Sequence, residues 1–239
     1  QHGVGIDFDA MSMDDPNVYK TISDGKTLGI FQLESPGMTR FITGLQPGNL
    51  EDIIAGIALY RPGPMDQIPQ YLENKKNPER IKYLHPILEP ILNVTYGCII
   101  YQEQVMQIVR DLAGYTMGQS DLVRRAMAKK KHDVMEKERV NFIAGAEKNG
   151  VAPDISNKIF DQMIDFASYA FNKAHAACYA VVGYETAWLK TYYPVEFMAA
   201  LLNSFMDRTD KIAQYIEECR QMNIKILPPD INLSYGKFT

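Results

Sequence analysis

Apolar side chains recur three and four positions apart over much of this chain, which is the spacing of one face of an α-helix. The segment 38–45 shows this pattern and is followed by Pro47. The segment 53–58 shows it again and is followed by Pro62. Because proline cannot continue a helix, each proline predicts a helix end just before it. The pattern therefore predicts two short, packed helices in the first quarter of the chain.

The later part of the chain is also predicted to be helical. The amphipathic segment 104–113 is followed by Gly114, a residue that commonly lies just beyond a helix. Further helices are expected over 133–149, from Pro153 onward, and over 174–192, 195–206 and 209–222. Only residues 97–101 and 224–227 have the character of strands. The sequence therefore predicts a mainly α, multi-helix globular fold with a few short strands.

Length and composition indicate a folded protein outside the membrane. With 239 residues, 46% of them hydrophobic and 23% charged, the chain can bury one large core or two smaller ones. No apolar run approaches the roughly 20 residues that span a bilayer, and the N-terminus lacks the pattern of a signal peptide. We therefore expect a cytoplasmic protein. The first residue, Gln1, is not Met, and no tail follows the motif at 228–232, so we expect a piece of a longer polypeptide.

The cysteines indicate neither disulfides nor a metal site. Cys98, Cys178 and Cys219 are widely spaced and form no CxxC pair with nearby histidines. We expect reduced, packed thiols.

Residues 124–131 form a dense cationic patch in a chain whose formal net charge is −4. On a helix, Arg124 and Lys131 fall on one line and Arg125 and Lys129 fall on an adjacent line. The opposite arc is apolar and consists of Leu122, Val123, Ala126 and Met127. This arrangement predicts a helix with an apolar back and a basic front, suited to a partner with several negative charges. An ordinary solvated helix face remains the alternative.

The limits of this basic helix can also be predicted. Ser120 can accept hydrogen bonds from the free N–H groups of a first turn, and Asp121 complements the helix dipole. We therefore expect the helix to begin there. Lys130 projects onto the apolar arc, so we expect the helix to end or bend near it.

A second candidate anion site lies where the helix at 174–192 is expected to start. Lys173 immediately precedes the helix and His175 lies in its first turn, with Tyr179 one turn later. Free N–H groups and the dipole at a helix N-terminus both favour negative charge. The alternative is a plain helix start with a half-packed tyrosine.

Other patterns point less clearly to chemistry. Asp7 and Asp9 could hold divalent ions if they lay on a strand, but a solvated acidic segment explains them as well. His85 precedes a proline and is interpreted as a turn or helix-start residue. The sequence contains no nucleophile with an adjacent base and no glycine-rich phosphate loop. The residues alone thus predict a helical binder of polyanions without a complete catalytic centre.

Several sequence blocks together resemble one protein family. The blocks are GIFQLES at 29–35, ALYRPGPM at 58–65, YGCIIYQEQVM at 96–106, the basic run at 124–131 and FNKAHAACY at 171–179. Further matches are AWLK at 187–190, PVEFMA at 194–199 and ILPPDIN at 226–232. In this order and spacing they resemble the bacterial replicative DNA polymerase III alpha subunit, a C-family polymerase. The resemblance covers nearly the whole chain and implies its fingers domain, which closes over the nascent base pair.

The resemblance implies roles for particular residues. By this resemblance, the residues expected to contact the phosphates of the incoming nucleotide are Arg124, Arg125, Lys129, Lys130, Lys173 and His175. Tyr179 is expected to pack near the base or sugar, and Lys131 is expected to reach a DNA phosphate. Arg61, Gln102 and Glu103 are expected to shape the pocket or to orient the basic groups. We expect no catalytic residue and no metal ligand in this chain.

The family's other parts are expected to lie outside this sequence. Residues 1–28 are expected to be a lead-in segment from the palm, and residues 29–239 the helical fingers domain, with two possible subdomains meeting near 114–118. The resemblance implies that the palm holds Mg²⁺ with its aspartates, so this chain alone is expected not to polymerise. The implied partners are a deoxynucleoside triphosphate, primer-template DNA, the palm and remaining domains, and other replisome subunits.

Two other classes of function remain open. A general nucleic-acid-binding module would bind duplex DNA with a steep salt dependence. An assembly domain would use the basic face to bind an acidic protein. The acidic balance of the rest of the chain weakly disfavours a long polyanion as the partner.

Overall fold

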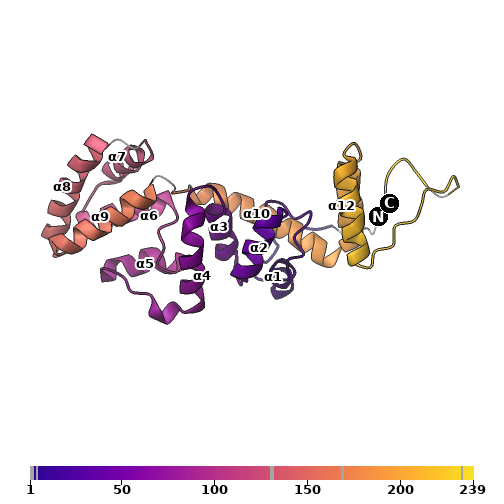
Figure 1. The fold of residues 1–239 in the computed structure, drawn as a ribbon, viewed down its shortest axis with the longest axis horizontal. Helices are drawn as coiled ribbons and strands as arrows, with labels where there is room; N and C mark the ends of the chain where they lie inside the picture. Colours follow the sequence, from indigo (N-terminus) through magenta and orange to yellow (C-terminus); the bar gives the residue numbers. More distant parts are fainter. Residues whose placement is uncertain (1–2, 4, 130–131, 168–169, 233) are drawn as a thin grey trace. The chain divides into compact units, whose positions relative to one another are not determined.

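The structure is a computed structural model that describes residues 3, 5–129, 132–167, 170–232 and 234–239 (Figure 1). Helices dominate these residues, so the mainly α fold class is confirmed. The α-helices are α1 (Pro16–Ser23), α2 (Pro36–Leu45), α3 (Leu50–Leu59), α4 (Ile68–Lys76), α5 (Glu89–Leu92), α6 (Gln102–Ala113), α7 (Met117–Ala128), α8 (His132–Lys148), α9 (Pro153–Ala167), α10 (Lys173–Tyr192), α11 (Pro194–Ser204) and α12 (Thr209–Gln221). Short 3₁₀ turns are η1 (Pro64–Gln67), η2 (Pro78–Arg80), η3 (Pro86–Leu88) and η4 (Asn93–Thr95).

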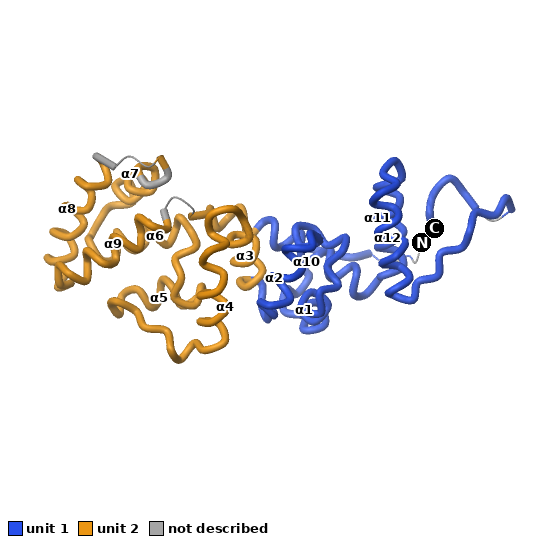
Figure 2. The backbone as a smooth tube through the Cα atoms, viewed as in Figure 1, with its two compact units in different colours: residues 1–50, 178–239 blue, residues 51–177 orange. Residues whose placement is uncertain are grey.

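The chain folds into two compact units (Figure 2). Unit 1 consists of residues 1–50 and 178–239, and unit 2 consists of residues 51–177. Helix α10 contributes its first residues to unit 2 and the remainder to unit 1. These units are defined by compact packing, and the expected division at residue 28 remains a prediction.

Unit 1 contains a helix that the sequence pattern did not reveal. Helix α1 begins after Asp15, whose Oδ1 accepts from Asn17 N at 2.8 Å, and Pro16 occupies its first position. The acidic segment around Asp15 is therefore a helix cap as well as a polar surface. Val18 and Ile22 are fully buried where α1 packs against α2.

A buried ion pair joins two helices of unit 1. Lys190 of α10 is 1% exposed and donates from Nζ to Glu218 Oε1 of α12 at 2.6 Å. The same Nζ donates to Leu28 O at 2.8 Å. Burial lowers the pKa of Lys190, because a charged ammonium loses its hydration there, while Glu218 opposes this effect. The two acceptors together replace the water that the ammonium gives up.

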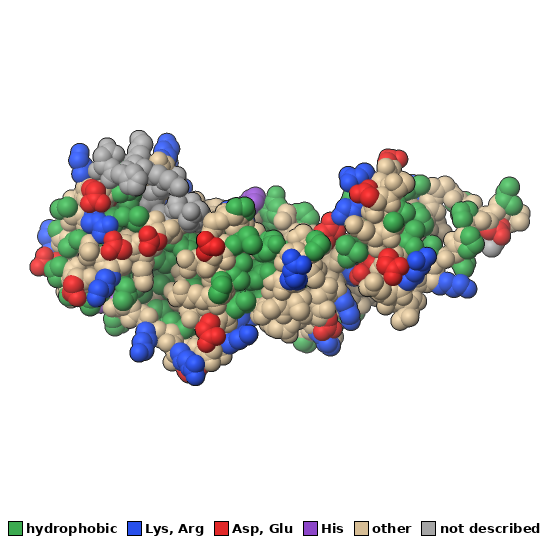
Figure 3. Space-filling model, viewed as in Figure 1, with side chains coloured by type: hydrophobic (Ala, Val, Ile, Leu, Met, Phe, Trp, Pro, Cys, Tyr) green, Lys and Arg blue, Asp and Glu red, His purple; other side chains and the backbone are tan. Residues whose placement is uncertain are grey.

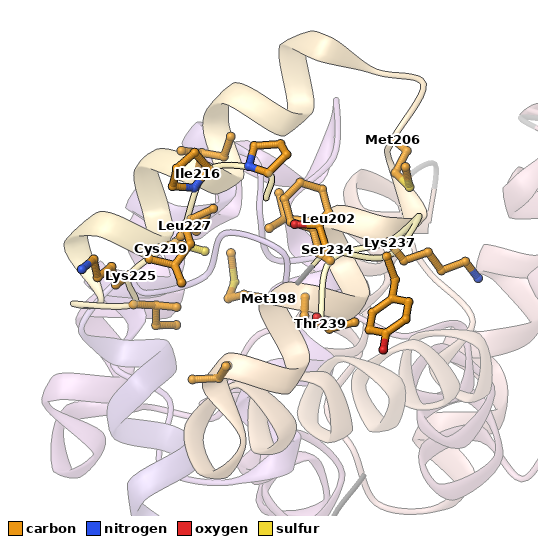
Figure 4. Close-up of a pocket in the computed structure, with 18 of the residues that line it drawn as sticks. Met198, Leu202, Met206, Ile216, Cys219, Lys225, Leu227, Ser234, Lys237 and Thr239 are labelled. Atoms are coloured by element: carbon orange, nitrogen blue, oxygen red, sulfur yellow. The ribbon is translucent and has the colours of Figure 1, made fainter. Parts of the chain in front are cut away.

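An apolar pocket lies in unit 1 between α11, α12 and residues 224–239, with a volume of about 1010 Å³ (Figure 4). Its floor includes Met198, Leu202 and Cys219, which belong to the hydrophobic cluster of these helices. Among the described residues, none that is expected to bind a nucleotide lines this pocket.

Unit 2 is built around the packing of α6 against α7 and α8, and of α8 against α9. Phe142 of α8 and Phe160 of α9 are fully buried, with their ring centroids 5.3 Å apart. Helix α6 ends as expected, because Gly114 has φ 72° and its N–H bonds to Arg110 O and Val109 O. The short connection to α7 is anchored by Tyr115, whose hydroxyl donates to Glu138 Oε2 at 3.0 Å.

Replacing Gly145 by alanine is expected to loosen unit 2. A Cβ at this position of α8 would collide with the Ala113 carbonyl oxygen of α6 and lie 3.1 Å from its Cβ. Overpacking of this kind costs roughly 1–3 kcal/mol, although alanine favours the helix by about 1 kcal/mol. Amide hydrogen exchange of α6 and α8 should therefore speed up. Gly118→Ala in α7 is the control, because no described atom outside its own stretch of helix lies within 4 Å of the new Cβ. Equal effects of both variants would contradict the packing argument.

The two segments expected to be strands are not strands. Tyr101 makes one isolated parallel bridge to Phe171, and residues 224–227 are irregular. A strand needs a paired neighbour, but the N–H groups of Ile100 and Tyr101 instead donate to the Gln104 side chain, at 2.8 and 3.0 Å. One buried amide thus replaces a neighbouring strand.

Candidate functional site

The basic helix α7 starts earlier than the sequence pattern suggested. It begins at Met117, and Thr116 precedes it as the cap: Thr116 Oγ1 accepts from Gln119 N at 3.3 Å, while Gln119 Oε1 accepts from Thr116 N at 2.9 Å. This reciprocal pair is a capping box, and its Thr-x-x-Gln spacing was readable in the sequence. The expected start at Ser120 is wrong, because its hydroxyl donates back to Met117 O inside the helix.

The apolar back of α7 is only partly as predicted. Val123 and Ala126 are 1% and 6% exposed, whereas Leu122 is 66% exposed. Met127 lies outside the side chains that the structure describes. The helix ends at Ala128, close to the expected position.

The Asp121 carboxylate lies between two arginines of α7. Arg124 donates to Asp121 Oδ1 from Nε at 2.9 Å and from Nη2 at 2.6 Å, while Arg125 Nε lies 2.7 Å from Oδ2. The residues are three and four positions apart, the spacing of neighbours on one helix face. The hydrogen bond from Arg124 lowers the pKa of Asp121 below its usual value, so the carboxylate stays charged at neutral pH.

Gln102 connects Arg124 to the segment that precedes α10. Its Oε1 accepts from Arg124 Nη1 at 3.2 Å, and its Nε2 donates to Ala170 O at 3.1 Å. Its backbone N–H donates to Phe171 O at 2.9 Å. A side chain that we expected to orient the basic groups therefore contacts one of them directly.

Glu103 occupies the N-terminus of α10. Its Oε1 accepts from Asn172 Nδ2 at 2.7 Å and its Oε2 accepts from Lys173 N at 3.0 Å. Asn172 Oδ1 accepts from His175 N at 2.8 Å, as a helix cap does. The anion site expected at this helix start thus already holds an anion, supplied by α6.

Lys173 is held by a residue that the sequence analysis missed. Its Nζ lies 2.9 Å from Glu51 Oε1 of α3 and 5.4 Å from the centroid of the Tyr101 ring. Glu51 and Lys173 are 122 positions apart, so no local spacing could have paired them. The Lys173 side chain is 33% exposed and therefore remains accessible.

Arg61 and His175 both pack on Phe171. The Arg61 guanidinium carbon lies 3.9 Å from the centroid of the Phe171 ring, and Arg61 Nε donates to Ala58 O at 3.0 Å. The His175 ring meets the same phenyl ring edge to face, with centroids 5.3 Å apart. Burial lowers the pKa of Arg61, although a guanidinium remains charged at neutral pH. Phe171 thus fixes two of the expected site residues.

The remaining expected residues are placed differently. Lys129 is exposed near the end of α7. Tyr179 belongs to unit 1, where its ring lies 5.3 Å from that of Phe31. Lys130 and Lys131 lie outside the described residues. The structure therefore brings together Arg61, Gln102, Glu103, Arg124, Arg125, Lys173 and His175 as one network in unit 2.

Charge on the surface is mixed. On the face shown in Figure 3, basic and acidic side chains are interspersed. The basic side chains Arg124, Arg125, Lys129 and Lys173 belong to a chain whose formal net charge is −4.

Within the described ranges, no three His, Cys, Asp or Glu side chains form a potential metal site. Asp7 Oδ1 accepts from Asp9 N at 3.0 Å and from Ala10 N at 3.3 Å, so this carboxylate closes a turn.

The described part of the chain also has no helix long and apolar enough to cross a bilayer. His85 Nδ1 accepts from Ile87 N at 3.3 Å at the start of η3, which confirms its expected helix-start role. Cys98 and Cys219 are free and buried, but Cys178 is exposed rather than packed.

The sequence model of the bacterial DNA polymerase III alpha subunit finger domain matches residues 1–150. The chain belongs to this family. The family resemblance predicted from the sequence blocks is thereby confirmed.

Curated relatives of this family member carry the name DNA polymerase III subunit alpha. The protein from Thermus aquaticus is 48% identical over 237 residues, that from Haemophilus influenzae 49% over 241, and that from Chlamydia trachomatis 51% over 226. The matches cover 97%, 98% and 95% of this chain, but 19%, 21% and 18% of the relatives. The chain thus spans about a fifth of the length of these relatives.

Proposed function

We propose that this chain is the fingers region of a replicative, DNA-directed DNA polymerase and that the network in unit 2 binds the triphosphate of the incoming deoxynucleotide. The observation that carries the proposal is the linkage of Arg124, Gln102, Glu103 and Lys173 in one network of a chain from the finger-domain family. The family alone does not distinguish which residues meet the phosphates. The network supports assigning this contact to its basic side chains.

The chemistry of the network suits phosphate. Enzymes that transfer phosphoryl groups act mainly by positioning and by stabilising negative charge on the transferring oxygens. A guanidinium offers a planar fork of donors that matches two phosphate oxygens, and an ammonium adds a point charge. Arg124 and Lys173 supply one group of each kind from α7 and α10, and packing on Phe171 holds Arg61 in place.

In this proposal, the metal ions that the polymerase reaction needs are bound outside this chain. The carboxylates described above do not fit a two-metal centre, since Asp7 closes a turn and Asp121, Glu51 and Glu103 are engaged by cations or N–H groups. We assign Mg²⁺ to the palm of the same cytoplasmic polymerase. The chain alone is then not expected to extend a primer. Its partners are primer-template DNA, the palm and the remaining domains, and other replisome subunits through regions outside this sequence.

Binding can be tested by NMR, through a shift titration of the chain with magnesium-bound dATP. We expect saturable shifts in α7 around Arg124 and in residues 170–175, with α12 unchanged. Arg124→Gln should abolish most of the shifts at α7. Arg80→Gln is the matched control, because Arg80 is a 73% exposed arginine of the same unit. Shifts that spread over both units, or that survive Arg124→Gln, would contradict this assignment.

A further inference from the structure

Several cations of the network already contact carboxylates of the same chain. Arg124 and Arg125 contact Asp121, Lys173 contacts Glu51, and the α10 N-terminus contacts Glu103. An incoming triphosphate therefore meets donors that hold carboxylates. Binding has to proceed by exchange of one anion for another at some of these contacts.

Asp121 occupies the donors that a phosphate would need most. Its Oδ1 accepts hydrogen bonds from both Nε and Nη2 of Arg124, the two donors along one edge of the guanidinium group. Its Oδ2 takes Nε of Arg125. While these bonds last, neither arginine can offer its Nε-side edge to a phosphate.

This carboxylate is also easy to displace. The side chains of Asp121, Arg124 and Arg125 are 29%, 28% and 64% exposed, and ion pairs with this degree of solvent contact are individually weak. Arg124 has a second and different anchor, because its Nη1 donates to Gln102 Oε1. That neutral amide can keep the guanidinium in place after the carboxylate has left.

Resting on the proposed function, we propose that Asp121 is an exchangeable counter-ion that holds Arg124 and Arg125 until a triphosphate replaces it, and that it thereby sets nucleotide affinity. The two anchors have separate roles. Gln102 keeps Arg124 oriented, and Asp121 competes with the nucleotide for both arginines. Asp121 is in this sense an affinity-determining residue that never touches the bound nucleotide.

The test is steady-state nucleotide incorporation by the full-length polymerase subunit that contains this chain, with Asp121→Asn. Removing the competitor should lower KM for the deoxynucleotide roughly two- to fivefold and change kcat little, since ion pairs between partly exposed side chains contribute little individually. Asp121→Ala, which has no acceptor at all, should act in the same direction. The decrease in KM should become smaller at higher salt concentration, because salt screens the interactions between these charges.

The matched control is Glu136→Gln on α8, which removes the same charge beside Arg139. It should leave KM within about 1.5-fold of the unchanged enzyme, because the Glu136 side chain is 71% exposed and its contact with Arg139 is long, at 3.8 Å. An unchanged KM in Asp121→Asn would overturn the inference. A raised KM would also overturn it, because it would make Asp121 a strut that positions the arginines.

Arg125→Gln separates this inference from the proposed function. If Arg125→Gln raises KM while Asp121→Asn fails to lower it, only the counter-ion role is lost. If Arg124→Gln and Arg125→Gln both leave KM unchanged, the phosphate-binding assignment is lost and the counter-ion role with it.

Discussion

Replacing Glu218 by leucine is expected to lower the free energy of unfolding of unit 1 by about 3–5 kcal/mol. The substitution leaves Lys190 buried with Leu28 O as its one remaining described acceptor. A buried ammonium without a counter-ion must either stay charged in a poorly solvated place or give up its proton. Urea denaturation can be followed by the fluorescence of Trp188, the only tryptophan of the sequence, which lies in α10 within unit 1.

Two further variants make the result specific to the buried pair. Lys190→Met combined with Glu218→Leu removes both charges, so most of the lost stability should return. Asp210→Asn breaks the exposed pair with Arg208 and should cost no more than about 0.5 kcal/mol. A loss below about 1 kcal/mol in Glu218→Leu would show that water reaches Lys190 and that the pair is not structurally important.

Replacing Arg124 by glutamine in the full-length polymerase subunit is expected to raise KM for the deoxynucleotide about tenfold to a hundredfold. A hydrogen bond to a charged group is worth roughly 1.5–3 kcal/mol, and each 1.4 kcal/mol corresponds to a factor of ten. Arg124→Lys keeps the charge but loses the planar fork of donors. Its KM should therefore lie between that of the unchanged enzyme and that of Arg124→Gln. Single-nucleotide incorporation on a primer-template measures the effect.

The control for this prediction is again Arg80→Gln, which removes an exposed arginine of unit 2 that pairs with Glu79. It should leave KM unchanged. If Arg124→Gln and Arg80→Gln altered KM equally, the effect would come from net charge and not from a specific contact. A change in kcat alone would assign Arg124 to a step after nucleotide binding.

Local patterns were sufficient for much of the fold. In α2, the residues Met38, Phe41, Ile42 and Leu45 are all buried as their spacing predicted, and α6 ends at Gly114 in the left-handed conformation. These features depend on neighbours within one or two turns. Helix α1 was not predicted because its apolar residues are few, and its cap, Asp15, lies in an acidic stretch without helical periodicity.

The candidate site was less predictable, because its contacts join distant parts of the chain. The basic residues stand out in the sequence, and the family blocks mark Gln102 and Glu103. Nothing local indicates that Glu51 of α3 neutralises Lys173 or that Glu103 caps α10. These partners are set by tertiary packing. The helical periodicity of 3.6 residues predicts which face of a helix is buried, but it does not predict which distant residues that face contacts.

The two units also differ in how they can be made. Unit 2 is one uninterrupted stretch, residues 51–177, whereas unit 1 combines residues 1–50 with residues 178–239. A ribosome that adds roughly 5–20 residues per second delivers all of unit 2 before the second part of unit 1 exists. Helices α1 and α2 can pack against each other early, but the side of α1 where Tyr19 contacts Tyr184 stays uncovered until α10 has emerged. During synthesis, the half that carries the arginines can be finished first, and the half that carries Lys190 and Glu218 closes last.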